Sequence, residues 1–400
     1  MSPAQIRFEV DGRFAADRSV VLRYAPALLR GWLATEELLP WSRREGTRVL
    51  DLGRWRGVGL QLLDESSGMA SGTHKSLDGC LSTALCRKHA IRRAVFSSGA
   101  NAGSALSLYG AGSGLESFFF CPAANLGKLD GALFESPCTH LIAVEGSDRR
   151  VKEAARLASA RLGAPLIPDL DWRMLAAGCR GLFIAEQILQ NGQGFGWVAQ
   201  SVCAGYGPLG IYRAFAGLVD SGSFDRARVP RFLGVQQAGL CPVVRAWEQR
   251  RRTLPPLAAA DWQEAPIEPA LYNVHPEETY PLLCEALATW GGDMVTISQG
   301  EFDHYGKEFL ARVEGAGLRL TRTVIGGREQ IAERAGLLAG AGALKAIAEG
   351  RVEQGDAVLC ALTGGAGPAP SKPAVPQLRI GLADNLDQAV LALVRHLGES

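Results

Sequence analysis

The chain has 400 residues, of which 47% are hydrophobic and 21% charged, and its formal net charge is +1. This length is enough for two or three domains of ordinary globular composition. The near-neutral charge argues against nucleic acid or an anionic membrane as the main partner, and no apolar run reaches the ~20 residues that span a bilayer.

The N-terminal stretch and the cysteines bear on where the protein works. MSPAQIRFEVDGRF lacks the basic start and the apolar centre of a signal peptide. The nine cysteines are dispersed singly, with no CxxC pair and no histidine at zinc-ligand spacing. We therefore expect reduced thiols, a cytoplasmic location and no bound metal.

Apolar runs that end in glycine-rich turns recur along the chain. Residues 92–114, 139–163 and 196–218 each read as a strand, a turn and a helix. Further short apolar strands are predicted at residues 116–122, 230–239 and 355–365. Because strands alternate with helices, the pattern predicts parallel sheets covered by helices, an α/β fold.

Two connecting segments and a terminal helix follow from composition. Residues 251–266 predict a loop, and the Pro/Ala-rich residues 364–377 predict an extended connector. After this connector, residues 380–398 predict an amphipathic helix with Asp384 or Asn385 as its N-cap. The apolar stripe of this helix consists of Leu386, Val390, Leu393 and Leu397.

Lys75 lies among small and hydroxylated residues in the stretch SGTHKSLDG, residues 71–79. An alternating apolar run precedes this stretch, and CLSTALC, which is typical of a buried helix, follows it. A lysine in this setting is either a solvated turn residue or a buried amine. A buried amine can form a Schiff base with an aldehyde cofactor.

The stretch SSGANAG, residues 97–103, follows a predicted strand and opens a predicted helix. Its small residues let the backbone approach a ligand, and the free N–H groups at the helix start favour an anion such as a carboxylate. Asn101 adds a side chain that both donates and accepts hydrogen bonds. The alternative interpretation is a tight strand-to-helix turn without a ligand.

The stretch AGYGPLG, residues 204–210, lies between another predicted strand and helix. Successive N–H groups at a helix N-terminus can hold a phosphate. The stretch has neither the GK[ST] of a Walker loop nor the GxGxxG of a dinucleotide site. Pro208 has no N–H, so the phosphate turn would use Gly205, Tyr206, Gly207 and Leu209.

These three motifs, in this order, resemble the tryptophan synthase β-type (fold type II) pyridoxal-phosphate enzymes, and most of all the threonine synthases. The segment FLGVQQAGLCPVVRAW resembles the threonine synthase pattern GVQAAGCAPIVRAF, and SSGANAGSAL resembles SSGNAGAAL. The resemblance covers nearly the whole chain. It implies a pyridoxal 5'-phosphate cofactor and two lobes, each a mainly parallel sheet flanked by helices.

The resemblance also implies how the lobes divide the chain. Residues 1–88 and 176–377 would form the larger, cofactor-binding lobe. Residues 89–175 would form the smaller lobe, which carries the loop for the substrate carboxylate. Residues 378–400 would add a C-terminal strand and helix.

Roles for single residues are implied by the same resemblance. Lys75 would hold the cofactor and move the α-proton, Asn101 would contact the ring hydroxyl, and Thr363 would meet the pyridine nitrogen. A hydroxyl at that nitrogen favours expulsion of a leaving group. The residues implied to bind the substrate carboxylate are Ser97, Ser98, Gly99 and Ala102. Those implied to bind the phosphate are Gly205, Tyr206, Gly207 and Leu209.

The departures from the threonine synthase pattern concern the substrate. THKSL stands where that pattern has SFKDR, and TGGAGPAP stands where it has TGHGLKD. Ala100 is one residue more than SSGNAG contains. We therefore expect His74 and Ser76 to reshape the space for the substrate side chain, and phosphohomoserine to be a poor substrate.

Several functions remain open at this point. The favoured hypothesis is a replacement or an elimination at Cβ or Cγ of a phospho- or acetyl-serine or -homoserine, within specialised amino-acid metabolism. The alternatives are a deaminating dehydratase and a catalytically silent paralogue that binds a ligand or partner. We also expect a homodimer with a small amino acid as its substrate.

Overall fold

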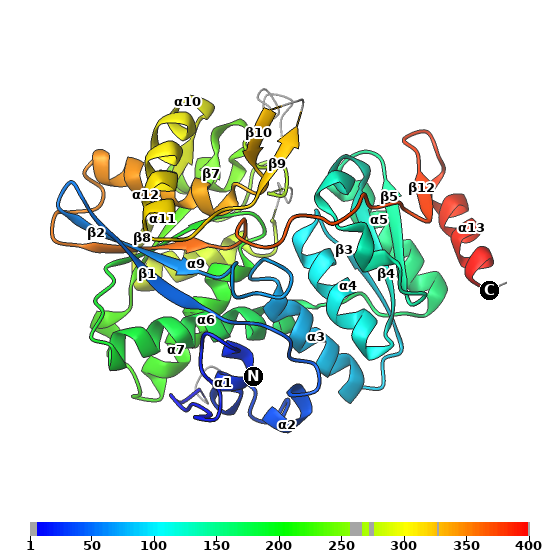
Figure 1. Ribbon diagram of the computed structural model, residues 1–400, viewed down its shortest axis with the longest axis horizontal. Helices are drawn as coiled ribbons and strands as arrows, with labels where there is room; N and C mark the ends of the chain where they lie inside the picture. Colours follow the sequence, from blue (N-terminus) through cyan, green and yellow to red (C-terminus); the bar gives the residue numbers. More distant parts are fainter. Residues whose placement is uncertain (1–5, 257–265, 272–275, 326–327, 399–400) are drawn as a thin grey trace.

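The computed structural model describes residues 6–256, 266–271, 276–325 and 328–398. Within these residues, a six-stranded and a four-stranded sheet form two lobes joined side by side, and residues 322–325 and 328–331 pair as a separate two-stranded sheet (Figure 1). The predicted α/β fold with parallel sheets flanked by helices is confirmed. The predicted loop at 251–266 is described only at its ends, and residues 257–265 lie outside the described residues.

The elements of the described residues have the following bounds. The helices are α1 Val20–Leu28, α2 Thr35–Leu38, α3 Ser76–Lys88, α4 Asn101–Ser113, α5 Asp148–Leu162, α6 Leu170–Gln190, α7 Tyr206–Asp220, α8 Pro242–Glu248, α9 Tyr280–Trp290, α10 Gln299–Glu301, α11 Lys307–Gly315, α12 Ala335–Ala348 and α13 Leu386–Gly398. The strands are β1 Arg48–Trp55, β2 Val58–Asp64, β3 Arg93–Ser97, β4 Glu116–Pro122, β5 Thr139–Val144, β6 Trp197–Ser201, β7 Arg231–Gln237, β8 Gly292–Ile297, β9 Arg322–Ile325, β10 Arg328–Ile331, β11 Ala357–Leu362 and β12 Leu378–Ile380.

The larger sheet has the strand order β1-β2-β11-β6-β7-β8. Strands β1 and β2 form an antiparallel hairpin, and every later pair is parallel. Because β2, β11, β6 and β7 run in the same direction, their C-terminal ends meet at one edge of the sheet. In open α/β sheets this edge is where ligands bind.

In the larger sheet, β11, β6 and β7 are buried over nearly their whole length, which explains why they read as apolar runs, whereas the edge strand β1 is largely exposed. Helices α11 and α12 cover one face, where Leu60, Leu233 and Val235 pack with Phe309 and Leu338. Helices α1, α6, α7 and α9 cover the other face (Figure 1).

The smaller sheet has the order β12-β5-β4-β3 and is parallel throughout. Helices α3 and α4 lie on the side facing the larger lobe, and α5 and α13 cover the outer side (Figure 1). The predicted C-terminal helix is confirmed, and Asn385 caps it by accepting a hydrogen bond from the Gln388 N–H at 3.1 Å.

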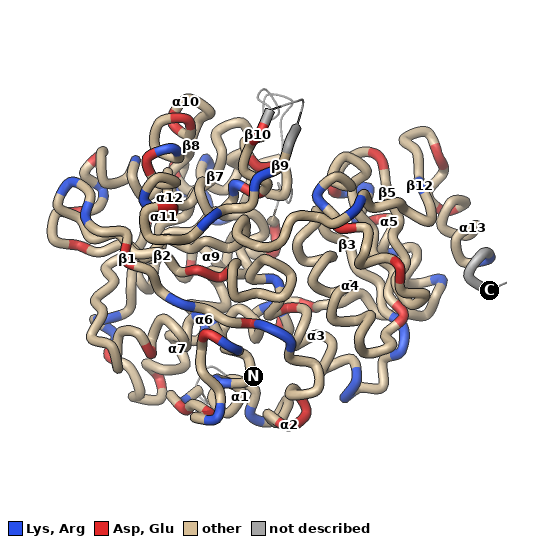
Figure 2. The backbone as a smooth tube through the Cα atoms, viewed as in Figure 1, with Lys and Arg blue, Asp and Glu red and all other residues tan. Residues whose placement is uncertain are grey.

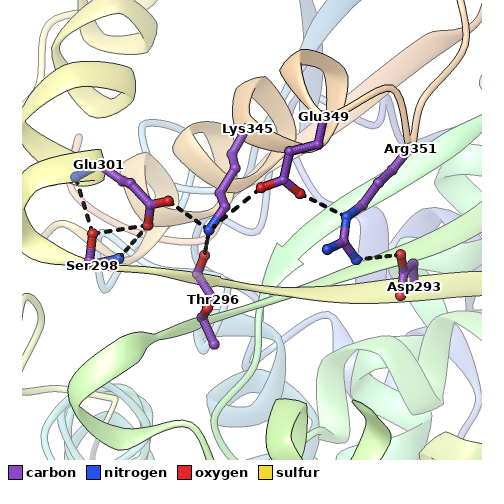
Figure 3. A network of polar contacts seen from close by, with 7 residues as sticks. All are labelled: Asp293, Thr296, Ser298, Glu301, Lys345, Glu349 and Arg351. Atoms are coloured by element: carbon purple, nitrogen blue, oxygen red, sulfur yellow. Dashed lines mark hydrogen bonds and ion pairs between the residues drawn. The ribbon is translucent and has the colours of Figure 1, made fainter.

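A polar network fixes α12 to β8, the edge strand of the larger sheet. The Lys345 Nζ donates to the Thr296 carbonyl at 2.9 Å and pairs with Glu301 at 2.7 Å (Figure 3). Nearby, Arg351 pairs with Asp293 of β8 at 2.8 Å. An edge strand carries unpaired backbone groups, and here charged side chains engage it.

Positions of basic and acidic residues are interspersed along the backbone of both lobes (Figure 2). This distribution agrees with the formal net charge of +1. Within the described part of the chain, no helix combines the length and the apolar character needed to cross a membrane.

Candidate active site

Lys75 lies directly before helix α3, at the edge where the strands of the larger sheet end. Its N–H donates to Thr73 Oγ1 at 3.3 Å, and its Nζ pairs with Asp78 Oδ2 at 2.8 Å. The side chain is 18% exposed. Of the two alternatives for this lysine, the structure therefore shows the largely buried amine.

The lysine loop, residues 71–75 directly before α3, is bonded to the end of β11. Thr73 forms an isolated bridge with Gly364, and the Thr363 carbonyl accepts from the His74 N–H at 2.9 Å. The His74 Nδ1 lies 3.1 Å from the same carbonyl. These contacts place Lys75 and Thr363 at one point of the larger lobe.

His74 is held as a neutral imidazole. Burial, together with the charges of Lys75 and Arg180, lowers the pKa of His74 well below its usual value. Since a carbonyl can only accept, the Nδ1 atom facing Thr363 carries the hydrogen, and Nε2 is the acceptor.

Ser76 occupies a different place from the one predicted. Its side chain is fully buried, and its Oγ accepts from the Ser71 N–H at 2.9 Å and bonds to Ser71 Oγ at 2.8 Å. The hydroxyl therefore holds the lysine loop together instead of bordering the space for a substrate side chain.

The predicted carboxylate loop lies on the smaller lobe. Ser97 ends β3, Ala100 takes the position before the helix, and Asn101 is the first residue of α4. The additional residue Ala100 thus extends the turn and leaves Asn101 at the helix start. The N–H groups of Asn101 and Ala102 belong to the first turn, where α-helices leave donors without an intrahelical acceptor.

The remaining polar groups of this loop serve the turn itself. The Ser98 N–H donates to the Phe120 carbonyl at 3.2 Å, and Ser98 Oγ accepts from the Ala100 N–H at 3.3 Å. The Gly99 carbonyl accepts from Asn125 Nδ2 at 2.7 Å. Asn125 follows β4, so it supports the loop from the neighbouring strand.

The predicted phosphate turn connects β6 to α7. Gly205 is the N-cap with a φ of 78°, a left-handed conformation that favours glycine, and α7 begins at Tyr206. The Leu209 N–H already donates to the Gly205 carbonyl at 3.2 Å, as a regular helical bond. The Leu209 N–H is thus engaged within the helix, and the N–H groups of Gly205, Tyr206 and Gly207 are the other candidates for holding the phosphate.

Gly207 has no room for a side chain. A Cβ atom there would lie 2.6 Å from Gln200 Nε2 and 2.7 Å from Arg180 Nη1. Arg180 and Gln200 thus press against the first turn of α7, and only glycine permits that approach.

Arg180 and Glu65 form an ion pair whose side chains are both 0% exposed. Arg180 Nε and Nη2 donate to the two Glu65 oxygens at 2.6 and 2.5 Å. Burial raises the pKa of Glu65, although the guanidinium opposes that shift. The sequence interpretation missed this pair, because Arg180 lies on α6, a helix it did not identify.

Glu333 was also missed by the sequence interpretation, yet it lies directly at the predicted site. Its Oε2 accepts from Asn101 Nδ2 at 3.1 Å, and its Oε1 lies against Gly364. Burial and the nearby Glu268 raise the pKa of Glu333 to about 7. The one available signal was an acidic residue directly before a buried Ala/Gly-rich helix.

Two contacts join the smaller lobe to the larger one at this site. One is the Asn101–Glu333 hydrogen bond, and the other is an ion pair between Lys128 and Glu268. Glu268 is fully buried and also accepts from the Arg334 N–H at 2.7 Å. The carboxylate loop is thereby held opposite Thr363 and the lysine loop.

The arrangement fits an aldehyde cofactor that carries a phosphate. Lys75 supplies an amine, and the first turn of α7 supplies N–H donors where a Cβ atom could not fit. Arg180 Nη1, a buried nitrogen without a hydrogen-bond partner among the described residues, lies against that turn. A largely buried lysine at the strand ends of the larger of two α/β lobes, together with a glycine-containing turn at the start of α7, is the arrangement expected of a fold type II pyridoxal-phosphate enzyme.

The chain belongs to the family of pyridoxal-phosphate dependent enzymes, whose model matches residues 44–364. Its cofactor is therefore pyridoxal 5'-phosphate, and the resemblance to fold type II enzymes is confirmed. Threonine synthase from Escherichia coli has the same fold, with a TM-score of 0.67, 13% identity and coverage of 94% of this chain and 88% of that one. Diaminopropionate ammonia lyase from Escherichia coli gives a TM-score of 0.62 at 13% identity, covering 91% and 93%.

A curated sequence relative is the cysteate synthase of Methanoregula boonei. It is 30% identical over 175 residues, which are 42% of this chain and 37% of the relative. The chain thus matches little more than a third of the relative's length.

Among the described residues, no group of three or more His, Cys, Asp and Glu side chains could hold a metal ion.

Proposed function

We propose that this enzyme catalyses replacement or elimination at Cβ or Cγ of an activated amino acid, such as a phospho- or acetyl-serine or -homoserine. The observation that best supports this proposal is that direct contacts link the lysine loop, the end of β11 and the carboxylate loop. Thr73 bridges to Gly364, which lies against Glu333, which accepts from Asn101. Bound pyridoxal phosphate would supply an electron sink that acidifies the α-carbon of an attached amino acid.

The residues around this centre divide the tasks. The first-turn N–H groups of Asn101 and Ala102 would bind the substrate carboxylate, with Ser97, Ser98 and Gly99 shaping the approach. Lys75 Nζ would take the α-proton, and the leaving group would depart with its electron pair. In a replacement, the nucleophile would then bond to the side-chain carbon and Lys75 would return a proton to Cα. Thr363, a neutral partner for the pyridine nitrogen, would favour expulsion of that leaving group.

Chemistry at Cβ is favoured over chemistry at Cγ by the curated relatives. Their name, cysteate synthase, describes formation of an amino acid substituted at Cβ. The space for the side chain lies beside His74, whose neutral imidazole offers Nε2 as an acceptor for a hydrogen-bond donor of the substrate. We propose His74 as the residue that shapes this space.

The finer organisation of the protein is proposed on the same basis. We propose that residues 1–88 and 176–377 form the larger lobe, residues 89–175 the smaller one, and residues 378–400 a C-terminal addition. Nine cysteines without a disulfide support a reducing, cytoplasmic location. A two-fold homodimer is the commonest closed assembly for such an enzyme.

The experiment is a screen of the purified holoenzyme against phosphoserine, acetylserine and phosphohomoserine. Each is offered with water alone, with sulfide and with sulfite, in D2O, and products are identified by mass spectrometry. Replacement predicts a product that contains the added nucleophile and deuterium at Cα. Lys75→Ala should form no product, while Lys88→Ala, which changes an exposed lysine on the same helix, should keep full activity.

The screen separates the open alternatives. With serine and threonine included in the screen, a keto acid and ammonia formed from either amino acid, whose hydroxyl is not activated, would identify a deaminating dehydratase. Efficient threonine formation from phosphohomoserine would contradict the diverged substrate. No product from any substrate, with no change in the visible spectrum, would identify a silent paralogue.

A further inference from the structure

The ion pair of Arg180 and Glu65 leaves one end of the guanidinium unused. Arg180 Nε and Nη2 both donate to Glu65, and Nη1 is buried without a hydrogen-bond partner among the described residues. A guanidinium has five N–H donors and no acceptor. A buried cationic donor without an acceptor is costly, so its presence points to an acceptor that arrives with a ligand.

The position of Nη1 identifies the end of the site that it serves. A Cβ atom on Gly207 would lie 2.7 Å from Nη1, so Nη1 touches the second residue of α7. Helix α7 spans 15 residues, and its first turn offers free N–H donors and a positive dipole end. Two independent features, a helix start and a buried cation, therefore converge on one point.

Gln200 does not remove the need for a further acceptor. Its Nε2 would lie 2.6 Å from a Cβ atom on Gly207, and its Oε1 is also buried without a partner among the described residues. A rotation of this amide would offer Arg180 one acceptor. Nη1 carries two hydrogens, so one of them still faces the turn.

We propose that Arg180 is a cofactor-binding residue of this chain, whose Nη1 donates a charge-assisted hydrogen bond to the phosphate held at Gly205, Tyr206 and Gly207. Glu65 orients the guanidinium by holding its other edge. The ligand class is a phosphate monoester dianion, which neutral N–H donors alone bind less tightly than N–H donors beside a cation. The inference rests on the proposed position of the phosphate turn.

The test compares apoprotein affinity for pyridoxal 5'-phosphate with that for pyridoxal, which lacks the phosphate, by fluorescence titration. Glu65→Gln/Arg180→Gln removes both charges together and so leaves no unpaired buried charge. We expect this variant to bind pyridoxal as the wild type does and pyridoxal 5'-phosphate about 10- to 100-fold more weakly. Inorganic phosphate should raise the melting temperature of wild-type apoprotein and leave that of the variant unchanged.

Two further variants make the test decisive. Arg23→Gln/Glu186→Gln removes another Arg–Glu pair that holds α6, and it should keep the full phosphate preference. Arg180→Lys retains a cation in the same space and serves as the test if the double variant fails to fold. It should keep only part of the preference for the phosphorylated ligand. An unchanged preference for the phosphorylated ligand in either Arg180 variant would overturn the proposal.

Gly207→Ala separates this proposal from the position of the turn. An added Cβ atom would displace Arg180 and Gln200 from the first turn of α7, so the phosphate preference should fall. A preference that stays intact in this variant as well as in the Arg180 variants would show that the phosphate binds elsewhere. A preference lost in Gly207→Ala but intact in Arg180→Lys and Glu65→Gln/Arg180→Gln would leave the turn in place and reject Arg180.

Discussion

Glu333 makes a quantitative prediction, because its carboxyl is buried against Gly364 and close to a second acid. The pKa of Glu333 is raised from 4.5 to about 7 by burial first and by Glu268 second. The folded chain thus binds this proton more tightly than the unfolded chain does. The contribution of Glu333 to the free energy of unfolding is therefore largest below pH 4.5 and is lost as the pH rises towards 7.

The substitution Glu333→Gln removes the titration and keeps the shape. Its amide oxygen can still accept from Asn101 Nδ2, so the contact between the lobes is preserved. A difference of this size between folded and unfolded pKa corresponds to about 3 kcal/mol in free energy of unfolding. Relative to wild type, the variant should gain up to about this amount between pH 4.5 and pH 8.

Urea unfolding of the apoprotein at several pH values measures this difference. Glu301→Gln is a control of opposite sign: burial raises the pKa of Glu301, but hydrogen bonds from Lys345 and Ser298 outweigh this and lower it. That variant should lose stability relative to wild type as the pH rises towards 4.5, the usual glutamate value, and this loss should then stay constant up to pH 8. If the wild-type and Glu333→Gln curves stay parallel from pH 5 to pH 8, the argument from burial is wrong.

Three other substitutions test the site and the fold. Lys75→Ala should lose the visible absorbance of the lysine-bound cofactor and should lower turnover in a product assay by about 1000-fold or more. Its circular dichroism spectrum should stay unchanged. Thr363→Asp should slow replacement roughly tenfold, because a carboxylate keeps the pyridine nitrogen protonated, and a faster variant with the same product would contradict this. Lys345→Met loses the bonds to Thr296 and Glu301 and should lower the free energy of unfolding in urea by about 1–2 kcal/mol. An unchanged midpoint would show that the network does not contribute to stability.

The sequence predicts the parallel strands well because local pattern and tertiary role agree there. The runs that became β3, β4, β6, β7 and β11 are buried over most of their length, so their central residues are mainly apolar. The lysine loop and the two anion turns are equally local, since a strand end and a helix start are adjacent in the chain. Such features can be read without knowing the fold.

The polar pairs at the site could not be predicted in the same way. Arg180 and Glu65 are separated by 115 positions, and Asn101 and Glu333 by 232. Nothing within either neighbourhood reveals the partner, which only the packing of α6 and α12 on the sheet brings into contact. The hydroxyl of Ser76 was misjudged for a related reason, because its direction depends on how the lysine loop folds back on Ser71.

In its proposed contact with the ring hydroxyl, Asn101 would connect these polar pairs to the cofactor. Its side-chain amide has two N–H hydrogens and one acceptor oxygen, and one hydrogen serves Glu333. A second hydrogen is left for a ring hydroxyl, so the cofactor and the contact between the lobes need not compete for the same atom. Because burial and Glu268 raise the pKa of Glu333 to about 7, the strength of that contact changes near neutral pH. The Asn101–Glu333 hydrogen bond between the two lobes is therefore coupled to a buried proton beside the proposed site of reaction.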